Sequence, residues 1–290
     1  MRIGTRGSAL ALAQAGQVAR ALGGAELVEI TTSGDRDRER VTADKERWVK
    51  ELDAALLAGE IDLAVHSAKD VPAHLHEGLA IVACPRRADP RDALCGAQSL
   101  DALPPGARVG TSSLRRAAQL RALRDDLDVA ELRGNVDTRL RRLADGDYDA
   151  IVLALAGLER LGRADAAGAA LDALVPAAGQ GVLAVTARAG DKAARAAAAT
   201  IDDPQTTACL AAERALVRAL EADCHTPVGA HASRDPAGGR LTLRAFVGRE
   251  DGSMWLRDEL TEHPPSNPER LGETVAQRLL AAGAAEVLGR

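Results

Sequence analysis

Short apolar runs alternate with longer stretches of helical character along the first two thirds of the chain, and this rhythm restricts the fold more than any other feature. In the first part, apolar or β-branched runs at 28–32 and 61–66 alternate with predicted helices at 9–22 and 48–57. Alternation of this kind is typical of βαβ units and a largely parallel sheet. The rhythm then returns, with predicted strands at 108–110, 128–132 and 150–154 and predicted helices at 114–123 and 136–143. The sequence therefore predicts two α/β domains.

Two segments mark the passages between these domains. The polar, proline-containing stretch 86–92 is typical of a crossing linker, and a glycine-containing turn at 177–181 leads into a strand, 182–186, that could rejoin the first sheet. Two α/β domains joined by two crossings make a clamshell. We expect domain 1 to comprise residues 1–86 and 182–201, and domain 2 to comprise residues 87–181.

The pattern changes after residue 202. Asp203 is a predicted N-cap with Pro204 at the first helical position, and the helix is expected to run to about 222. Residues 241–247 alternate as a half-buried strand, Asp251 and Gly252 mark a hairpin turn, and Asn267 and Pro268 cap a final helix. Residues 202–290 are therefore predicted to form a small α+β domain.

Composition excludes several classes of protein. Hydrophobic residues make up 46% of the chain and charged residues 27%, which indicates a folded core and not a disordered chain. The longest apolar run, 150–158, is far shorter than the ~18 residues that cross a bilayer. The N-terminus shows no signal peptide, so we expect a cytoplasmic protein without membrane association. The four cysteines have no spacing typical of disulfides or zinc, so no metal is predicted.

Arginine carries nearly all of the positive charge. The net charge is −5, only four of the 37 basic residues are lysines, and the segment 106–142 holds nine arginines against five acidic residues. Guanidinium groups bind carboxylate and phosphate in a bidentate manner, so a local excess favours a small polyanionic ligand; arginines on solvated helix faces are the alternative. The aromatic content of 1% removes a stacking platform for single-stranded nucleic acid.

The segment 66–72 follows directly on a predicted apolar strand. Its polar side chains should therefore lie at the carboxyl end of a sheet, where open α/β folds bind ligands. Lys69 could neutralise a carboxylate, and Asp70 could act as an acid/base group. Two alternatives remain open: a solvated turn with a local ion pair, and a Ser67/Lys69 nucleophile pair, which lacks an oxyanion-hole motif.

Two further segments resemble anion cradles. Residues 110–116 (GTSSLRR) and 133–139 (RGNVDTR) each follow a predicted strand and open a predicted helix. They offer hydroxyls, backbone N–H groups, the positive end of a helix dipole and guanidinium groups. The alternative is that each is simply a capped helix start.

Among the thiols, only Cys224 lies where a sulfur atom could project. It follows the predicted helix end, where the backbone is irregular, whereas Cys209 falls within an Ala/Leu helix and should be buried. Cys84 and Cys95 have no catalytic partner in view. His225 could form a Cys/His pair with Cys224, although adjacent residues rarely point together.

Taken together, these motifs resemble the porphobilinogen deaminase (hydroxymethylbilane synthase) family along essentially the whole chain. The matching segments are 2–8 (RIGTRGS), 64–72 (AVHSAKDVP), 89–93 (DPRDA), 110–116, 132–140 (LRGNVDTRL), 156–162 (AGLERLG), 179–181 (GQG), and Cys224 before 227–229. The resemblance implies a monomeric transferase that joins four porphobilinogen molecules head to tail, loses ammonia each time and releases a linear tetrapyrrole. It also implies two domains of the type 2 periplasmic-binding fold forming a cleft, and a third domain.

The family's site residues carry over onto matching positions. Cys224 would hold one dipyrromethane per chain through a thioether. Its carboxylates would be bound by Lys69 of the 64–72 motif and by four residues of the first cradle, namely Thr111, Ser113, Arg115 and Arg116. The incoming ring and the growing oligopyrrole would be bound by Arg6, Ser8, Arg133, Arg139 and Arg160. Asp70 would contact pyrrole N–H groups of cofactor and substrate, assist proton transfer and stabilise the cation formed as the amine leaves.

Three positions depart from the family pattern. Residues 35–47 are highly charged where many members have a glycine-rich segment and a phenylalanine. Two interpretations stay open: a mobile flap with Trp48 as its aromatic tip, or an altered loop with different kinetics. The strand 182–186 lacks its usual acidic residue, and His225 replaces a glutamine beside the cysteine. None of the residues assigned to chemistry is missing.

Two other classes of protein compete with the enzyme. A type 2 periplasmic-binding-like sensor of a small carboxylate ligand would explain the cleft and the arginines, but it leaves Cys224 without a role. A nucleic-acid-binding protein would use the 106–142 cluster and show salt-dependent affinity for oligonucleotides. The negative net charge and scarce aromatics argue against it.

Overall fold

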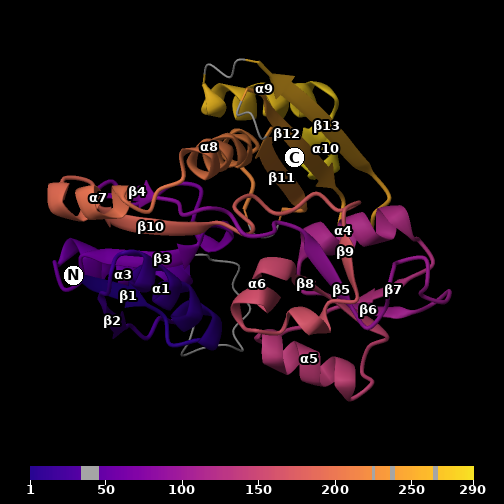
Figure 1. Cartoon of the computed structure of the whole chain (residues 1–290). Coiled ribbons are helices and arrows are strands. Elements are labelled where there is room, and N and C mark those ends of the chain that lie inside the picture. Colours follow the sequence, from indigo (N-terminus) through magenta and orange to yellow (C-terminus); the bar gives the residue numbers. More distant parts are fainter. Residues whose placement is uncertain (34–45, 224–225, 236–238, 264–266) are drawn as a thin grey trace. The chain divides into compact units, whose positions relative to one another are not determined.

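The computed structural model describes all residues except 34–45, 224–225, 236–238 and 264–266 (Figure 1). Most of the predicted charged loop (residues 35–45) lies outside the description, as do Cys224, His225 and the side chain of Trp48, whereas residues 46 and 47 begin a helix. The chain divides into two compact units. Unit 1 comprises residues 1–88 and 182–210, and unit 2 comprises residues 89–181 and 211–290.

Unit 1 is built on a five-stranded sheet in the order β2-β1-β3-β10-β4. Strand β1 (Arg2–Thr5) runs parallel to β2 (Glu26–Glu29) and β3 (Leu63–Ser67). Strand β10 (Leu183–Arg188) is antiparallel to both β3 and β4 (Leu79–Ala83). The prediction that this segment rejoins the first sheet is confirmed. The sheet is mixed: β1, β2, β3 and β4 run in one direction, as a largely parallel sheet requires, and the returning strand β10 enters between β3 and β4 in the opposite direction.

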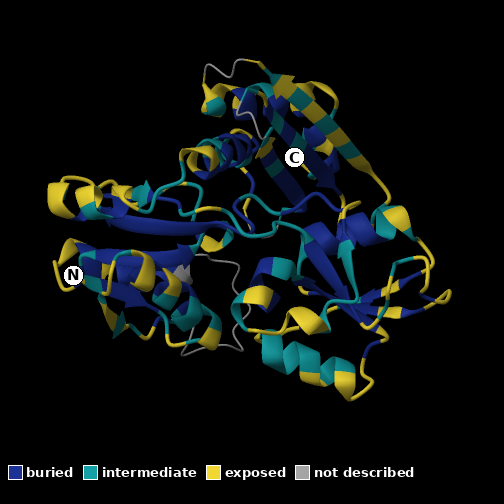
Figure 2. Cartoon of the chain, in the orientation of Figure 1, coloured by how far each residue is buried: buried dark blue, intermediate teal, exposed yellow. Residues whose placement is uncertain are grey.

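Helices cover both faces of this sheet. Helices α1 (Ala9–Ala21) and α7 (Lys192–Ala199) share one apolar cluster with Ile3, Leu63 and Val185, whereas α3 (Glu46–Leu57) packs on Ala64 of the other face. The strands β1, β3 and β10 are accordingly buried (Figure 2). Strand β2 begins before the predicted 28–32 because it is an exposed edge strand, where apolar alternation is not required.

The first sheet of unit 2 has the order β7-β6-β8-β5-β9. Strands β6 (Arg108–Gly110), β7 (Asp128–Ala130) and β8 (Ala150–Ala154) are parallel. Strand β5 (Asp92–Cys95) is antiparallel to β8 and to β9 (Ala169–Leu171). In both five-stranded sheets, three parallel strands are followed by one antiparallel strand (β10 or β5). The strand at the far edge (β4 or β9) is antiparallel to that fourth strand. This repeated topology is the type 2 periplasmic-binding fold that the sequence predicts, and the fold class is confirmed.

Helix starts in unit 2 occur where the sequence indicates them. Helices α4 (Leu114–Leu123) and α5 (Val136–Ala144) pack on opposite faces of the sheet, and α6 (Leu155–Arg160) follows β8 directly. Short 3₁₀ turns occur at η2 (Ala164–Ala166) and, in unit 1, at η1 (Ala68–Asp70). The segment 86–92, predicted to be a linker throughout, ends at the first residue of buried strand β5.

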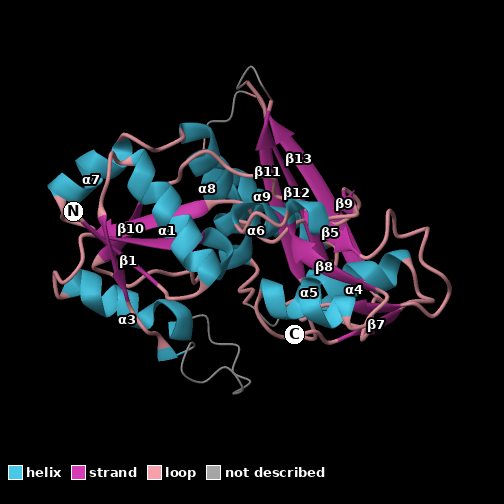
Figure 3. Ribbon diagram, turned by 60° about the horizontal axis from the view of Figure 1, so that its bottom comes forward, coloured by secondary structure: helices cyan, strands magenta, loops and turns pink. Residues whose placement is uncertain are grey.

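The C-terminal part of unit 2 is an antiparallel three-stranded sheet of β11 (Val228–Arg234), β12 (Leu241–Gly248) and β13 (Trp255–Glu262) (Figure 3). Helix α8 (Pro204–Ala219) precedes it, and α9 (Pro268–Ala281) and α10 (Ala284–Val287) follow. Asn267 caps α9, with its Oδ1 accepting from the Arg270 N–H at 3.2 Å, as predicted. No helix among the described residues is long and apolar enough to span a membrane. The division into three domains stays a prediction.

Candidate functional site

The polar residues predicted in unit 1 follow two neighbouring parallel strands. Lys69 and Asp70 lie on η1, which directly follows β3, and Arg6 and Ser8 follow β1. Asp70 is exposed, and the other three residues are half-buried. Ser8 caps α1, its Oγ accepting from the Ala11 N–H at 3.3 Å. Because the carboxyl ends of parallel strands meet at one edge of a sheet, this edge combines two cations, a helix N-terminus and one exposed carboxylate.

His66 is the buried residue of β3 that precedes this edge. Its Nε2 lies 3.2 Å from Thr186 Oγ1. Burial, and after it the positive charge of Arg6, lowers the pKa of His66 to about 4. An unfolded histidine has a pKa near 6.5, so between these values the unfolded chain binds a proton that the folded chain excludes.

We therefore expect stability to fall as the pH falls from about 6.5 to 4. Between pH 7.5 and pH 5 the loss from His66 alone is about 2 kcal/mol in the free energy of unfolding. Urea titrations at the two pH values measure it, and the His66→Asn variant should lose that part of the difference. An equal pH dependence in both proteins would contradict this assignment.

In unit 2, the first cradle begins where β6 ends. Ser113 caps α4, its Oγ accepting from the Arg116 N–H at 3.4 Å, and Thr111 Oγ1 accepts from the Ser113 N–H at 3.2 Å. Thr111 is buried. The two hydroxyls therefore hold the strand–turn–helix in shape, and α4 presents its positive end at this turn.

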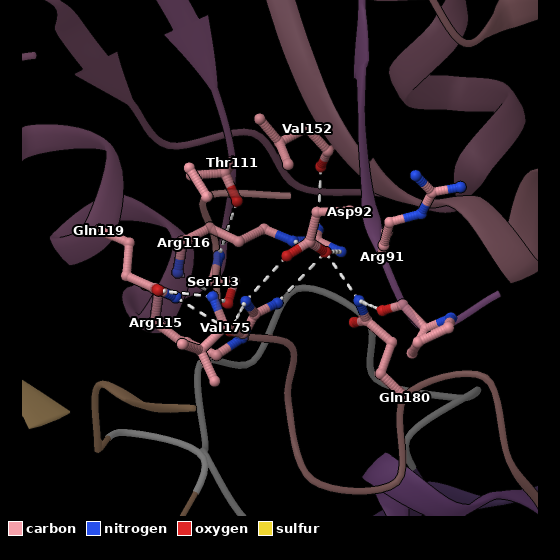
Figure 4. Close-up of polar contacts among 12 residues, drawn as sticks. Arg91, Asp92, Thr111, Ser113, Arg115, Arg116, Gln119, Val152, Val175 and Gln180 are labelled. Carbon is pink, nitrogen blue, oxygen red and sulfur yellow. Dashed lines mark hydrogen bonds and ion pairs between the residues drawn. The ribbon is translucent and has the colours of Figure 1, made fainter. Parts of the chain in front are cut away.

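The two guanidiniums of this cradle meet a buried carboxylate (Figure 4). Asp92 has 0% of its surface exposed and Arg115 and Arg116 have 5% each. Arg115 Nη1 donates to Asp92 Oδ2 at 2.8 Å, and Arg116 Nε donates to Oδ1 at 2.9 Å. Burial alone would raise the pKa of Asp92, but the charges of Arg115 and Arg116 outweigh it and hold that pKa well below its usual range. No role could be predicted for Asp92 from the sequence, since its partners lie more than twenty positions away.

Arg139 joins the second cradle to the first. Asn135 caps α5, and Arg139 donates from Nε to the Gly134 carbonyl at 2.7 Å and from Nη2 to Ser112 Oγ at 3.0 Å. Burial, followed by the charge of Arg116, lowers the pKa of Arg139 to about 10. Within the described part of the chain, no carboxylate forms an ion pair with Arg139. A positive charge is therefore held here without a compensating acid.

The other two predicted arginines differ in their surroundings. Arg160, at the end of α6, donates from Nη2 to the Gly181 carbonyl at 2.7 Å, and its Nε is buried with no hydrogen-bond partner. Burial lowers its pKa. Arg133 is exposed and pairs with Glu131 at 2.6 Å, so its charge is already balanced.

Three of the four cysteines belong to the described residues. Cys84, Cys95 and Cys209 are all buried, which confirms the expectation for Cys209. Burial raises the pKa of the Cys95 thiol to about 11. A thiol with so high a pKa is a poor nucleophile at neutral pH.

These features define a class: an α/β protein of the periplasmic-binding fold whose second unit includes a segment, 106–142, with nine arginines against five acidic residues. Buried or half-buried guanidinium donors suit a small ligand that carries several carboxylates. The dipyrromethane expected from the sequence is such a group, because each of its pyrrole rings carries two carboxylates. The residues present therefore fit it.

Comparison with known proteins identifies the family. Residues 1–196 match the model "Porphobilinogen deaminase, dipyromethane cofactor binding domain", and residues 207–281 match "Porphobilinogen deaminase, C-terminal domain". The chain is 47% identical over 301 residues to the porphobilinogen deaminase of Roseiflexus castenholzii, covering 99% of this chain and 98% of that protein. For that of Rubrobacter xylanophilus the identity is 49% over 298 residues, covering 99% and 96%. The chain belongs to the porphobilinogen deaminase family.

The predicted activity class and cofactor are thereby confirmed. The protein is a transferase of tetrapyrrole synthesis with a dipyrromethane cofactor, and the ligand-sensor alternative is not favoured.

Proposed function

We propose that the chain joins four porphobilinogen molecules head to tail on a dipyrromethane attached to Cys224 by a thioether. One ammonia leaves at each addition, and hydrolysis finally releases hydroxymethylbilane. The observation that carries this proposal is the pair Arg139 and Arg160 of unit 2, neither of which forms an ion pair with a carboxylate among the described residues. Every added ring brings two carboxylates that need such partners.

The cofactor's carboxylates would be held by the first cradle and by Lys69. Arg115 and Arg116 supply guanidinium donors, and Thr111 and Ser113 shape the turn at the positive end of α4. When bound, dipyrromethane would supply the free pyrrole carbon to which the first new ring is joined, and each later ring would be joined to the ring added before it. The protein's task is therefore to fix the position of this group and to screen its negative charge.

The incoming ring would be bound by Arg6, Ser8, Arg133, Arg139 and Arg160. Arg139 and Arg160 are the strongest candidates among these, since burial has already removed much of their hydration and no acid compensates Arg139. Binding a carboxylate there replaces lost water contacts by charge-assisted hydrogen bonds. Arg133 would have to exchange its partner Glu131 for the ligand.

Asp70 would carry the chemistry. It is an exposed carboxylate directly beside Lys69 at the carboxyl end of β3. It would accept hydrogen bonds from pyrrole N–H groups and assist proton transfer to the departing amine. Its negative charge would also stabilise the positive charge that develops on the substrate ring.

Several finer features belong to the same proposal on the strength of the family pattern. We propose a monomeric cytoplasmic enzyme without nucleic-acid or membrane partners. The domains would be residues 1–86 with 182–201, residues 87–181 and residues 202–290, with Trp48 as the aromatic tip of a flap.

Incubation of the purified protein with porphobilinogen tests the function. We expect ammonia to be released in equal amount to the porphobilinogen consumed, with one linear tetrapyrrole formed for each four molecules. The same incubation with boiled protein is the control. If porphobilinogen persists and no ammonia forms, the proposed function is wrong.

A further inference from the structure

Asp92 lies at the centre of a buried polar network in unit 2 (Figure 4). Besides the two arginines, the Gln180 side chain donates from Nε2 to Asp92 Oδ1 at 2.9 Å. The same Gln180 nitrogen donates to the Pro90 carbonyl at 2.7 Å. Pro90 and Gln180 lie next to two of the three points where the chain passes between the units, before residue 89 and after residue 181. One amide therefore fastens both connecting segments to this carboxylate.

Moving the Asp92 carboxylate out of its position would cost much free energy. Its backbone belongs to β5, which is paired on one side with β8 through Ala154 and on the other with β9 through Leu171. Moving the carboxylate away from the arginines would leave a charge buried without a partner, which is strongly unfavourable. A ligand carboxylate should thus bind beside Asp92 and not replace it.

The arginine pair is held by more than Asp92, yet it keeps free donors. Arg115 Nη1 also donates to the Val175 carbonyl at 2.7 Å, and Arg116 Nη1 donates to the Val152 carbonyl at 2.9 Å. Gln119 holds Val175 in turn, accepting from its N–H at 2.7 Å. A guanidinium has five N–H groups, and these contacts do not use them all. Both side chains are therefore fixed in orientation with donors remaining for a ligand.

We infer that Asp92 is a positioning residue, which holds the guanidiniums of Arg115 and Arg116 in the orientation that binds the cofactor's carboxylates, and that Gln180 holds Asp92. This inference rests on the proposed function. Asp92 also offsets the repulsion between two adjacent buried cations, which could not otherwise share one site. The single negative charge of Asp92 does not balance Arg115, Arg116 and nearby Arg139 together. The cluster therefore keeps a net positive charge, as an anionic ligand requires.

The test compares the parent with Asp92→Asn in two assays. Apoprotein from a host that makes no porphobilinogen is incubated with porphobilinogen, and intact mass follows the gain of the cofactor. We expect Asp92→Asn to load about 10-fold more slowly, and kcat/KM of the loaded form to fall about 10- to 100-fold. Asp126→Asn, which breaks the exposed pair with Arg124, should match the parent within about twofold.

A double-mutant cycle separates positioning from general damage. If Asp92 acts through the arginines, Asp92→Asn combined with Arg116→Lys should be within about threefold of Arg116→Lys alone in both assays. Effects that multiply would overturn the inference, as would a folded Asp92→Asn protein that loads and turns over like the parent. Should Asp92→Asn fail to fold, Gln180→Ala takes its place in the same cycle. We expect it to lower the loading rate and kcat/KM by less, and the combined variant should again be within about threefold of Arg116→Lys alone.

The result for the parent protein separates a failure of the proposed function from a failure of the positioning role alone. If the parent neither gains the cofactor mass nor consumes porphobilinogen, the proposed function fails. If the parent does both and the Asp92→Asn or Gln180→Ala effects are absent or multiplicative, only the positioning role fails.

Discussion

Replacement of Asp70 by asparagine is expected to lower kcat by about 100- to 10,000-fold while the cofactor stays attached. The amide keeps the size of the side chain and one hydrogen-bond acceptor, but it removes the negative charge and the ability to take up a proton. Initial rates of ammonia release measure the loss. Intact mass shows whether the protein still carries the dipyrromethane.

The position of Asp70 makes this a clean experiment. The side chain is exposed on η1, after the buried strand β3 has ended, so its replacement should change the free energy of unfolding by no more than about 0.5 kcal/mol. A lost rate would therefore reflect chemistry and not folding. Asp70→Glu keeps the charge one methylene further out, and we expect it to recover part of the activity.

A matched control is available in the same unit. Glu77 is likewise an exposed carboxylate, seven positions along the chain, and no role is assigned to it. Glu77→Gln should retain the rate of the parent within about twofold. Full activity in Asp70→Asn would show that neither the charge nor the proton-accepting group of Asp70 serves the reaction.

Local signals in the sequence predicted much of the fold. Helix α4 and strand β8 have the predicted boundaries, because Ser113 provides a cap and 150–154 is an uninterrupted apolar run. Strand β5 was missed for the opposite reason. It begins with an aspartate after a polar stretch, and nothing nearby shows that this charge becomes neutralised inside the unit.

The candidate site likewise combines features that neighbouring residues specify with features that depend on distant residues. The cradle at 110–116 was visible because its cap and its arginines are neighbours in the chain. The links that complete the site join distant positions: Arg115 meets Asp92 across 23 residues, and Arg139 meets Ser112 across 27. Such pairs are products of sheet order, so only the three-dimensional structure shows which arginines already have a carboxylate.

The second large effect is expected at the cofactor's attachment point. Cys224→Ala should have the mass of the bare polypeptide, give no colour with Ehrlich's reagent and lack activity, because alanine has no sulfur with which to form a thioether. The parent should carry one dipyrromethane. For each protein, the intact mass under reducing conditions and then the colour with Ehrlich's reagent are measured on the same preparation.

The other thiols make poor substitutes for Cys224. Cys84, Cys95 and Cys209 are buried, and burial raises the pKa of Cys95 to about 11, so few molecules carry a reactive thiolate there. Cys209→Ala removes a thiol within an alanine-rich helix and is the matched control, expected to keep both the mass increment and the activity. An increment that persists in Cys224→Ala would move the attachment to another residue, and a peptide map of that protein would locate it.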